Sequence, residues 1–327
     1  MWRFDSSQAR HSIFAIATDW GFLMDNKCCF VQFIHPGGEH IPDNEKYKFW
    51  NTGNHKRKFI KNKGKYIKKL KDTPKEEDIV FWGEWEPESK IVKAIANPLR
   101  NGPKYIYEPF YTKFEEKNPP LQNTDPFVFG NQFHYTICQQ YKNGKATQLR
   151  YLEKDSVILF GSCQKRSQFI LDTVFVVGEY YIDHEKATYK TVLKNKITET
   201  YEEVTIAPSY QKSVIRTKHG FKSVQNQQSF RLYFGATYNN SFDGVFSFFP
   251  CLPFNKAEKG FARPIIKLEG VITDDLPQGN KLNRQNSTEN IIRKLWTEVV
   301  KQVLDQRLYL GIFTELPKKQ KINSNNR

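Results

Sequence analysis

The sequence has no long apolar run and few cysteines, and each shortage argues against a class of protein. No stretch approaches the roughly 20 apolar residues of a membrane-spanning helix, and the N-terminus lacks the apolar core of a signal peptide. The five cysteines are odd in number and never spaced as Cys-X-X-Cys, which argues against a disulfide framework and a structural zinc site. We therefore expect a cytoplasmic protein with no membrane partner, and no sequence feature identifies a cofactor.

Aromatic residues, by contrast, are abundant. The chain has 327 residues, of which 39% are hydrophobic and 26% charged, so it can bury a core rather than remain disordered. Aromatic residues make up 15% of the chain and favour the half-buried surface of a β-sheet. Length and composition together predict two domains or one large domain of β type.

Positive charge is concentrated in one segment. The formal net charge is +15, and residues 46–75 hold eleven lysines and one arginine against a single acid, Asp72. Aromatic residues lie among these cations, so the segment is suited to neutralising phosphates and stacking on bases. The alternative is an ordinary solvated surface rich in lysine. The side chains expected to bind phosphate are His55, Lys56, Arg57, Lys58, Lys61, Lys63 and Lys65.

Short apolar runs bounded by turn residues predict a chain made mostly of strands. Residues 156–162 and 169–178 flank a polar turn and predict a hairpin of two buried strands. Further strands are predicted at residues 28–34, 79–83, 190–193, 204–207, 230–234 and 245–249.

Only one long helix is predicted, over residues 287–307. Ser287 is a suitable N-cap, and apolar residues follow it at helical spacing. The predicted fold is α+β and β-rich, with one or more small barrels closed by this C-terminal helix. We expect a first part at residues 1–122, which contains the basic segment 46–75, and a second β-rich part at 123–327. The apolar residues expected on one helix face are Ile292, Leu295, Trp296, Val299 and Val303.

A turn rich in glycine and histidine follows the strand at 28–34. Pro36, Gly37 and Gly38 favour a tight turn, which would bring His35, Glu39 and His40 toward one point. Two imidazoles and a carboxylate are suited to acid–base catalysis or to holding a divalent metal. They would equally serve to orient a ligand, and an ordinary turn with satisfied histidines is the remaining alternative.

A second candidate site lies at the end of the strand at 79–83. Trp82 and Glu84 alternate along the chain and therefore share one strand face, and Trp85 follows directly. A tryptophan beside a carboxylate is suited to stacking on a base and accepting a hydrogen bond from its amino group. The alternative places both tryptophans in the core and the glutamate in solvent.

Cys138 is a candidate nucleophile near two further polar residues, Asn123 and Asp125, which are expected to help bind a ligand. His134 cannot pair with Cys138 along one strand, because residues i and i+4 lie about 13 Å apart. His35, His40 and His55 are the possible partners. The alternative is a buried, inert cysteine, since free cysteine is among the most buried residue types.

The order of these motifs resembles a known group of proteins. The run His35-Pro36-Gly37-Gly38-Glu39-His40, the basic stretch 55–69 and the strand 78–85 are similar to the bacterial nucleotide-modification-associated domains. The strand itself resembles that of PUA-like small barrels, which include EVE and ASCH domains. The resemblance covers about residues 10–180, and it implies a PUA-like barrel that binds nucleic acid or a modified base in a cleft beside the strand.

The motifs and the resemblance together predict a nucleic-acid- or nucleotide-binding protein associated with base modification or its recognition. An enzyme acting on a nucleotide or base is the alternative, with His35, Glu39 and His40 as acid–base or metal-binding groups. A structural interaction module without chemistry is the third possibility.

Overall fold

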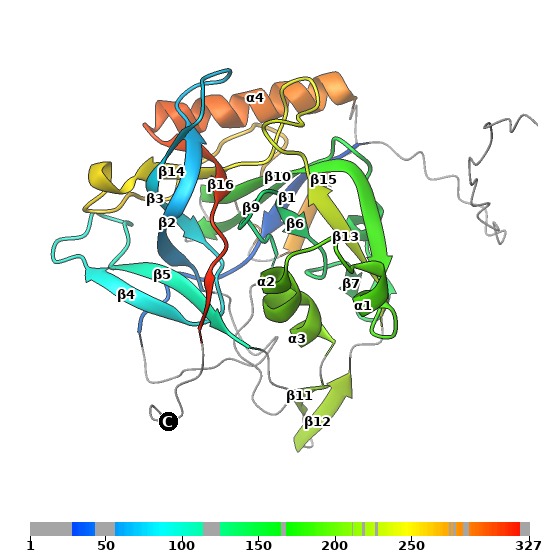
Figure 1. Cartoon of the computed structure of the whole chain (residues 1–327). Coiled ribbons are helices and arrows are strands. Elements are labelled where there is room, and N and C mark those ends of the chain that lie inside the picture. The colour runs from blue at the N-terminus through cyan, green and yellow to red at the C-terminus, as the bar shows by residue number, and fades with distance from the viewer. Residues whose placement is uncertain are drawn as a thin grey trace, which may run out of the picture.

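The computed structural model confirms a β-rich α+β fold, with 42% strand and 16% helix. Two large sheets pack together, and a long helix lies over one side of them (Figure 1). The structure describes residues 28–42, 56–113, 125–164, 168–210, 228–274, 276, 279–283 and 288–320, together with the backbone of 212–217 and 220–225.

The first sheet has six strands in the order β15-β1-β9-β10-β13-β6. Its strand β1 is buried along its whole length and is apolar except for Gln32, a composition typical of strands covered on both faces. The strands β9 and β10 form the predicted antiparallel hairpin, while β1 runs parallel to β9. The bounds are β1 Phe30–Ile34, β6 His134–Tyr135, β9 Val157–Gln164, β10 Gln168–His184, β13 Phe230–Gly235 and β15 Gly279–Asn283.

The second sheet closes on itself as a small barrel. Its strands β16, β14, β3 and β2 pair in sequence, and β16 also pairs with β2, which completes a ring of four. The strands β5, β4 and β17 extend it on one side. The bounds are β2 Lys58–Ile67, β3 Lys75–Gly83, β4 Ser89–Ala94, β5 Tyr105–Thr112, β14 Phe249–Pro253, β16 Tyr309–Thr314 and β17 Lys318–Gln320.

Smaller elements lie between the strands of the sheets, most of them between successive strands of the six-stranded sheet. They are the hairpins β7 (Tyr141–Lys142) with β8 (Lys145–Ala146) and β11 (Lys212–Thr217) with β12 (Gly220–Gln225), the short helices α1 (Tyr189–Val192), α2 (Glu199–Tyr201) and α3 (Ala207–Ser209), the π-helical turn η2 (Glu202–Ile206), and the 3₁₀ turns η1 (Gln148–Tyr151) and η3 (Phe254–Lys256).

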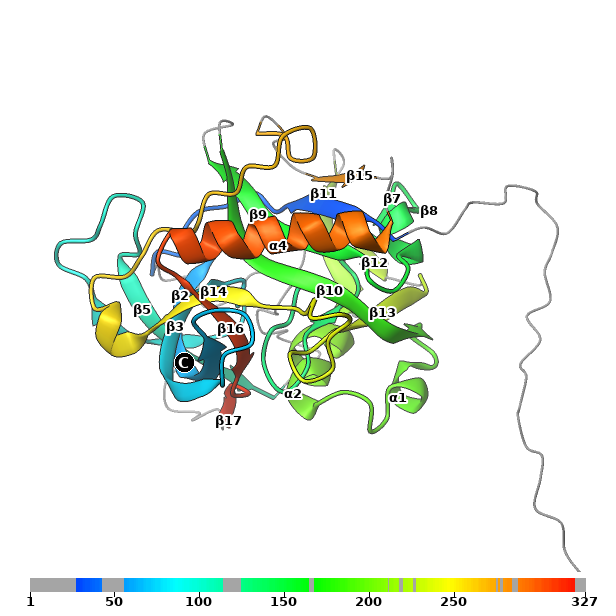
Figure 2. The same ribbon diagram turned by 90° about the horizontal axis from the view of Figure 1, so that it is seen from above.

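The predicted C-terminal helix is confirmed as α4, Glu289–Asp305. Its N-cap is Thr288, and the expected cap Ser287 lies outside the described residues. The expected apolar face is buried except for Leu295, which is half-buried. Figure 2 shows α4 lying across β9 and β10, whose outer-facing apolar residues share its core cluster. None of the helices in the described ranges has the length and apolar character needed to cross a membrane.

Three secondary-structure predictions are wrong or shifted. Residues 190–193 and 204–207 form helical turns rather than strands. Their β-branched residues favour strands, but Val204 and Ile206 are buried by packing on the core, which overrides that preference. The strand predicted at 245–249 begins only at Phe249.

The expected division at residue 122 does not coincide with a division between the sheets. The strand β1 lies in the same sheet as β9 and β10, and β16 closes the barrel against β2. Each sheet is therefore built from both ends of the chain.

Trp296 is the largest side chain that α4 buries, and its removal tests the packing of the helix. The indole packs edge-on against Phe246 at 5.1 Å and donates to the Phe246 carbonyl. Trp296→Ala is expected to lower the free energy of unfolding by about 3–5 kcal/mol in denaturant titration, because it leaves a cavity. The matched change on the exposed face, Lys294→Ala, should cost less than about 0.5 kcal/mol. Equal losses would contradict this packing.

Candidate active site

Three side chains from distant parts of the chain form a hydrogen-bonded row. His35 Nδ1 lies 2.9 Å from both carboxylate oxygens of Glu84, and His35 Nε2 lies 2.8 Å from Cys138 Sγ. His35 and Glu84 are buried, and Cys138 is half-buried. A thiol, an imidazole and a carboxylate in this order have the connectivity of a nucleophile, its base and the group that orients the base.

Each of the three residues lies where a strand ends. His35 follows β1, and its backbone N–H donates to the Gly161 carbonyl, which extends the pairing of β1 with β9 by one bond. Glu84 follows β3, and Cys138 lies in the turn after β6. The site therefore lies where the six-stranded sheet meets the barrel.

Asp125 holds the backbone of the cysteine turn. Its carboxylate accepts the N–H of Thr136 at 2.9 Å and the N–H of Cys138 at 2.8 Å. Burial raises the pKa of Asp125 to about 7, although these N–H donors lower it, and the charge of Glu84 raises it further. The position of the thiol thus depends on a fully buried carboxyl group.

Arg57 ties the row to the rest of the core. Its guanidinium is completely buried and pairs with Glu84 at 2.8 Å and with Asp172 at 2.7 Å. It also donates to the carbonyls of His35, Gly37 and Gly161. Burial alone lowers the pKa of Arg57, but the charges of Asp172 and Glu84 raise it above its ordinary value. The arginine therefore stays charged and pairs with the Glu84 carboxylate beside His35.

A second arginine continues the network. Arg263 lies 3.2 Å from Asp172 and donates to the Ser162 hydroxyl at 3.0 Å. Burial lowers the pKa of Arg263, Asp172 raises it and the nearby Arg57 lowers it again. Two guanidinium groups and two carboxylates alternate along this chain of contacts, so their charges balance inside the core.

The thiol of Cys138 is neutral in this environment. Burial first, and then the negative charges of Asp125 and Glu84, raise the pKa of Cys138 well above its ordinary value. A thiol of this kind becomes a nucleophile only when a neighbouring base takes its proton, and His35 is the base in contact with it.

The histidine turn is only partly as predicted. His35 lies at the centre of the site and contacts Cys138, as one of the expected pairings required. The Glu39 carboxylate instead accepts the backbone N–H groups of Lys104 and Tyr105, before and at the start of β5. The His40 ring lies edge-on to Tyr107 at 6.0 Å. The expected convergence of the three side chains is therefore wrong, because the turn sends them to different partners.

The predicted base-binding tryptophans belong to the core. Trp82 is buried and donates to the Phe261 carbonyl at 2.9 Å, while Trp85 is buried and donates to the Glu88 carbonyl at 3.0 Å. Neither ring is open for stacking in this structure, which corrects the expected pocket. Glu84 and Asp125 lie at the site, whereas Asn123 and His55 lie outside the described residues.

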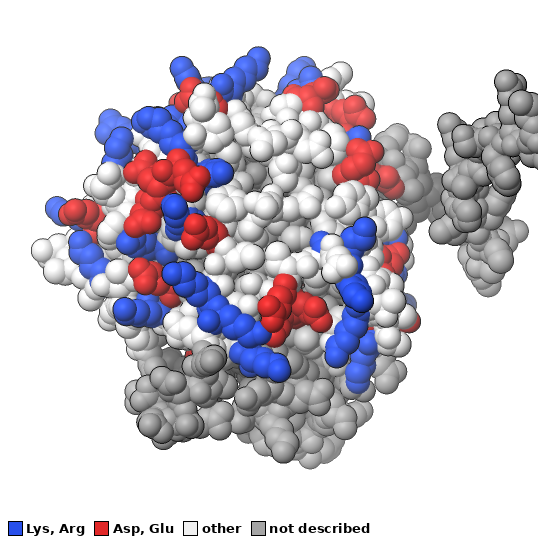
Figure 3. Space-filling view, viewed as in Figure 1, with Lys and Arg blue, Asp and Glu red and all other residues white. Residues whose placement is uncertain are grey.

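The basic segment contains strand β2, and several of the described lysines of that strand are paired locally. Arg57 and Lys58 are buried, which corrects their expected role in phosphate binding. Lys61 pairs with Asp78, and Lys63 and Lys65 pair with Glu76 on the adjacent strand β3. Lys56 is half-buried. Figure 3 shows acidic side chains among the lysines on the face that carries β2 and β3.

The sequence interpretation missed Asp172 and Arg263. One signal was present for Asp172, which is the single acid in the mostly apolar run 169–177 of β10 and therefore needs a charged partner when buried. Arg263 lies in an irregular segment with no such signal. In the described part of the chain, no three histidine, cysteine or acidic side chains are grouped to hold a metal ion.

Replacing Arg57 tests whether the network supports the fold. Arg57→Met is expected to lower the free energy of unfolding by about 3–5 kcal/mol, because it takes the shared cation from two buried carboxylates and leaves Glu84 with His35 and Asp172 with Arg263. Lys63→Met, which removes an exposed ion pair between Lys63 of β2 and Glu76 of β3, should cost less than about 1 kcal/mol. Denaturant titration at neutral pH compares the two, and similar losses would show that the buried pairing contributes little.

Comparison with known proteins does not assign the chain to a family or a function. No family model, no curated protein and no solved structure matches the chain. The resemblance to PUA-like barrels therefore remains an expectation from the motifs alone, and the function has to be inferred from the chain's own residues.

Proposed function

We propose that this chain is a thiol-dependent enzyme in which Cys138 is the nucleophile and His35 is its general base. The observation that supports this is the row of contacts Cys138–His35–Glu84, with distances of 2.8 and 2.9 Å. Glu84 is a positioning residue, since it contacts the far nitrogen of the imidazole. The row differs from the expected acid–base set in that Glu39 and His40 have no part in it.

Each residue has a defined role in the reaction. His35 Nδ1 donates its proton to Glu84, so Nε2 is unprotonated and accepts the Cys138 proton as sulfur attacks an electrophilic carbon. The new S–C bond forms as the electron pair of the old bond moves onto the leaving group. The imidazolium, which Glu84 stabilises, then gives its proton to that leaving group.

The buried arginine supports this proton transfer. Arg57 binds the Glu84 carboxylate and the His35 carbonyl, so the base and its orienting group are held by one side chain. A fixed imidazole loses little freedom when the reaction begins, which is the advantage of a preorganised site. The neutral thiol also protects Cys138 from oxidation before substrate arrives, because thiolates are the form that oxidises.

Alkylation by iodoacetamide tests the roles of Cys138 and His35. Cys138 should react more than about tenfold faster than Cys163 in the native protein, and His35→Gln should slow Cys138 by about 10²-fold or more, because a general base contributes at least that much. Cys163 is the matched control, since it is also half-buried but its sulfur lies 3.9 Å from a carbonyl, that of Thr273. Peptide mass spectrometry measures both rates.

A second variant serves as the test if His35→Gln lowers the melting temperature so far that the protein does not stay folded. Glu84→Gln should also slow Cys138, because an amide in place of the carboxylate favours the wrong imidazole tautomer. The rate at Cys163 should be unchanged in both variants. If Cys138 reacts no faster than Cys163, or if folded variants retain the wild-type rate, the nucleophile assignment is wrong.

Nucleic-acid binding is the second proposed function, supported by the net charge of +15 and by the lysines that β2 exposes. Lys63 and Lys65 keep about half of their side-chain surface exposed, 52% and 45%, although both contact Glu76. Ion pairs this exposed are weak and exchange readily for phosphate contacts. The motif resemblance to nucleotide-modification-associated domains favours the same class of partner, and would make the substrate of Cys138 a modified base or nucleotide.

Salt dependence tests the contribution of β2. The double change Lys63→Glu and Lys65→Glu should weaken binding to a fluorescent single-stranded oligonucleotide and reduce the slope of log K against log salt by about one unit for each lost phosphate contact. Reversal of Lys186 and Lys190, which are exposed elsewhere in the fold, is the charge-matched control. Equal slopes for the two double variants would remove β2 from the interface.

A further inference from the structure

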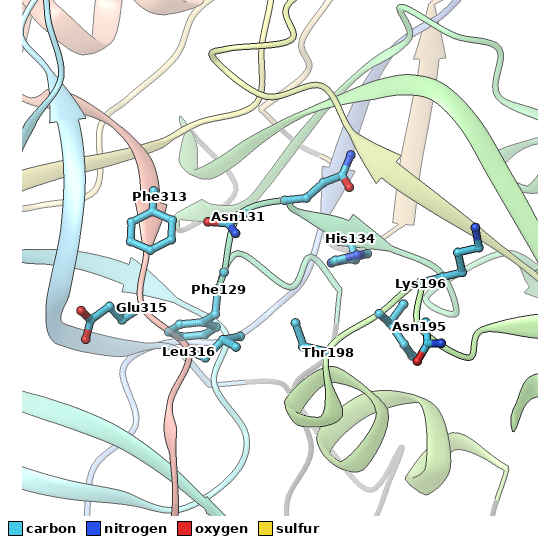
Figure 4. Close-up of a pocket in the computed structure, with 12 residues that line it drawn as sticks. Phe129, Asn131, His134, Asn195, Lys196, Thr198, Phe313, Glu315 and Leu316 are labelled. Atoms are coloured by element: carbon cyan, nitrogen blue, oxygen red, sulfur yellow. The ribbon is translucent and has the colours of Figure 1, made fainter.

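A pocket of about 590 Å³ lies apart from the cysteine site and has no role in the chemistry described so far. Its walls come from three places, namely the segment 129–134 leading into β6, the turn 195–198 before α2, and β16 with the residues after it (Figure 4). Its volume is within the range of small-molecule sites, which is about 300–1,000 Å³.

His134 is the unusual residue of the pocket wall. It is 5% exposed, its ring stacks on Tyr201 at 4.7 Å, and Phe234 lies edge-on to it at 5.2 Å. Its Nδ1 atom is buried without a hydrogen-bond partner among the described residues. Burial also lowers the pKa of His134 to about 3, so the ring is neutral and offers one donor and one acceptor. Buried polar groups are nearly always paired, so the unpaired Nδ1 sets His134 apart from the other lining residues. Protein covers this atom, so a ligand in the pocket meets the rest of the ring.

The other lining residues define the chemistry of that ligand. The pocket is lined by the rings of Phe129 and Phe313 and by the turn at Thr198. Most of its polar groups are uncharged, namely amides and one hydroxyl. The two charged side chains, Lys196 and Glu315, lie at opposite ends of the pocket in Figure 4. The uncharged polar residues are Asn131, Gln132, Asn195 and Thr198. The pocket therefore suits an uncharged molecule with several hydrogen-bonding groups and an apolar face.

We infer that this pocket binds the base of a nucleoside. Amide side chains pair with the donor and acceptor edge of a base, and the half-buried ring of Phe313, unlike the buried ring of Phe129, can accept its face. The neutral imidazole of His134 matches either a donor or an acceptor on that edge. This inference rests neither on Cys138 nor on the lysines of β2, so it stands or falls separately from both proposed functions.

Isothermal titration calorimetry with adenosine, guanosine, cytidine, uridine and free ribose tests the pocket. At least one nucleoside should bind with a Kd of about 1 mM or tighter, while ribose should not bind. His134→Phe keeps an aromatic ring against Tyr201 but removes both nitrogens, and it should weaken that nucleoside by about tenfold or more. Asn131→Ala changes an exposed amide of the pocket and should also weaken it.

The control is Asn240→Ala, an exposed amide in a turn that does not line the pocket. It should bind the nucleoside as the wild type does. If His134→Phe does not fold, Asn131→Ala alone decides. The inference is overturned if no nucleoside binds at millimolar concentration, if ribose binds as well as the nucleosides, or if the pocket variants bind like the control.

Discussion

The structure depends on a fully buried guanidinium. Arg57 has no contact with solvent, so every donor that it carries must be paired inside the protein. Its partners come from the end of β1, the segment after β3, β9 and β10, and they include the two carboxylates Glu84 and Asp172. One side chain therefore joins the six-stranded sheet to the barrel, and the same contact orients the imidazole beside the cysteine. The same hydrogen bonds of Arg57 therefore hold the core together and position the residues of the candidate active site.

Much of the fold could be predicted from patterns that are local in sequence. The alternation of apolar runs and turns gave the hairpin of β9 and β10, and the helical spacing of Ile292, Trp296 and Val299 gave α4. Pairing between distant strands could not be predicted, because nothing in the residues of β1 specifies β9 as its parallel neighbour. The closure of the barrel by β16 against β2 was equally out of reach. Local helical turns near 190 and 204 were missed because β-branched residues there are buried by tertiary packing.

The residues of the candidate site could be predicted from the sequence, but their arrangement could not. His35, Glu84 and Cys138 were each singled out, since each is a reactive residue close to a strand end. The sequence pattern placed these three residues in three separate motifs. It could not group them, because His35 and Cys138 are 103 residues apart in the chain and come into contact only in the folded structure. Arg57 was interpreted as one of many surface cations because its neighbours in sequence are lysines. The composition of a segment gives its number of charges. Whether one of these charges, such as Arg57, is buried depends on carboxylates from other segments, here Glu84 and Asp172.

The parallel pairing of β1 with β9 has a consequence for synthesis of the chain. β1 emerges from the ribosome long before β9, and its other neighbour, β15, comes later still. A strand that is apolar except for Gln32 therefore lies without its sheet neighbours until β9 has been made, in a form that is prone to associate with other unfinished chains. Contacts over such separations also close slowly. Until the sheet that holds His35 assembles around β1, association of this strand with other chains competes with folding.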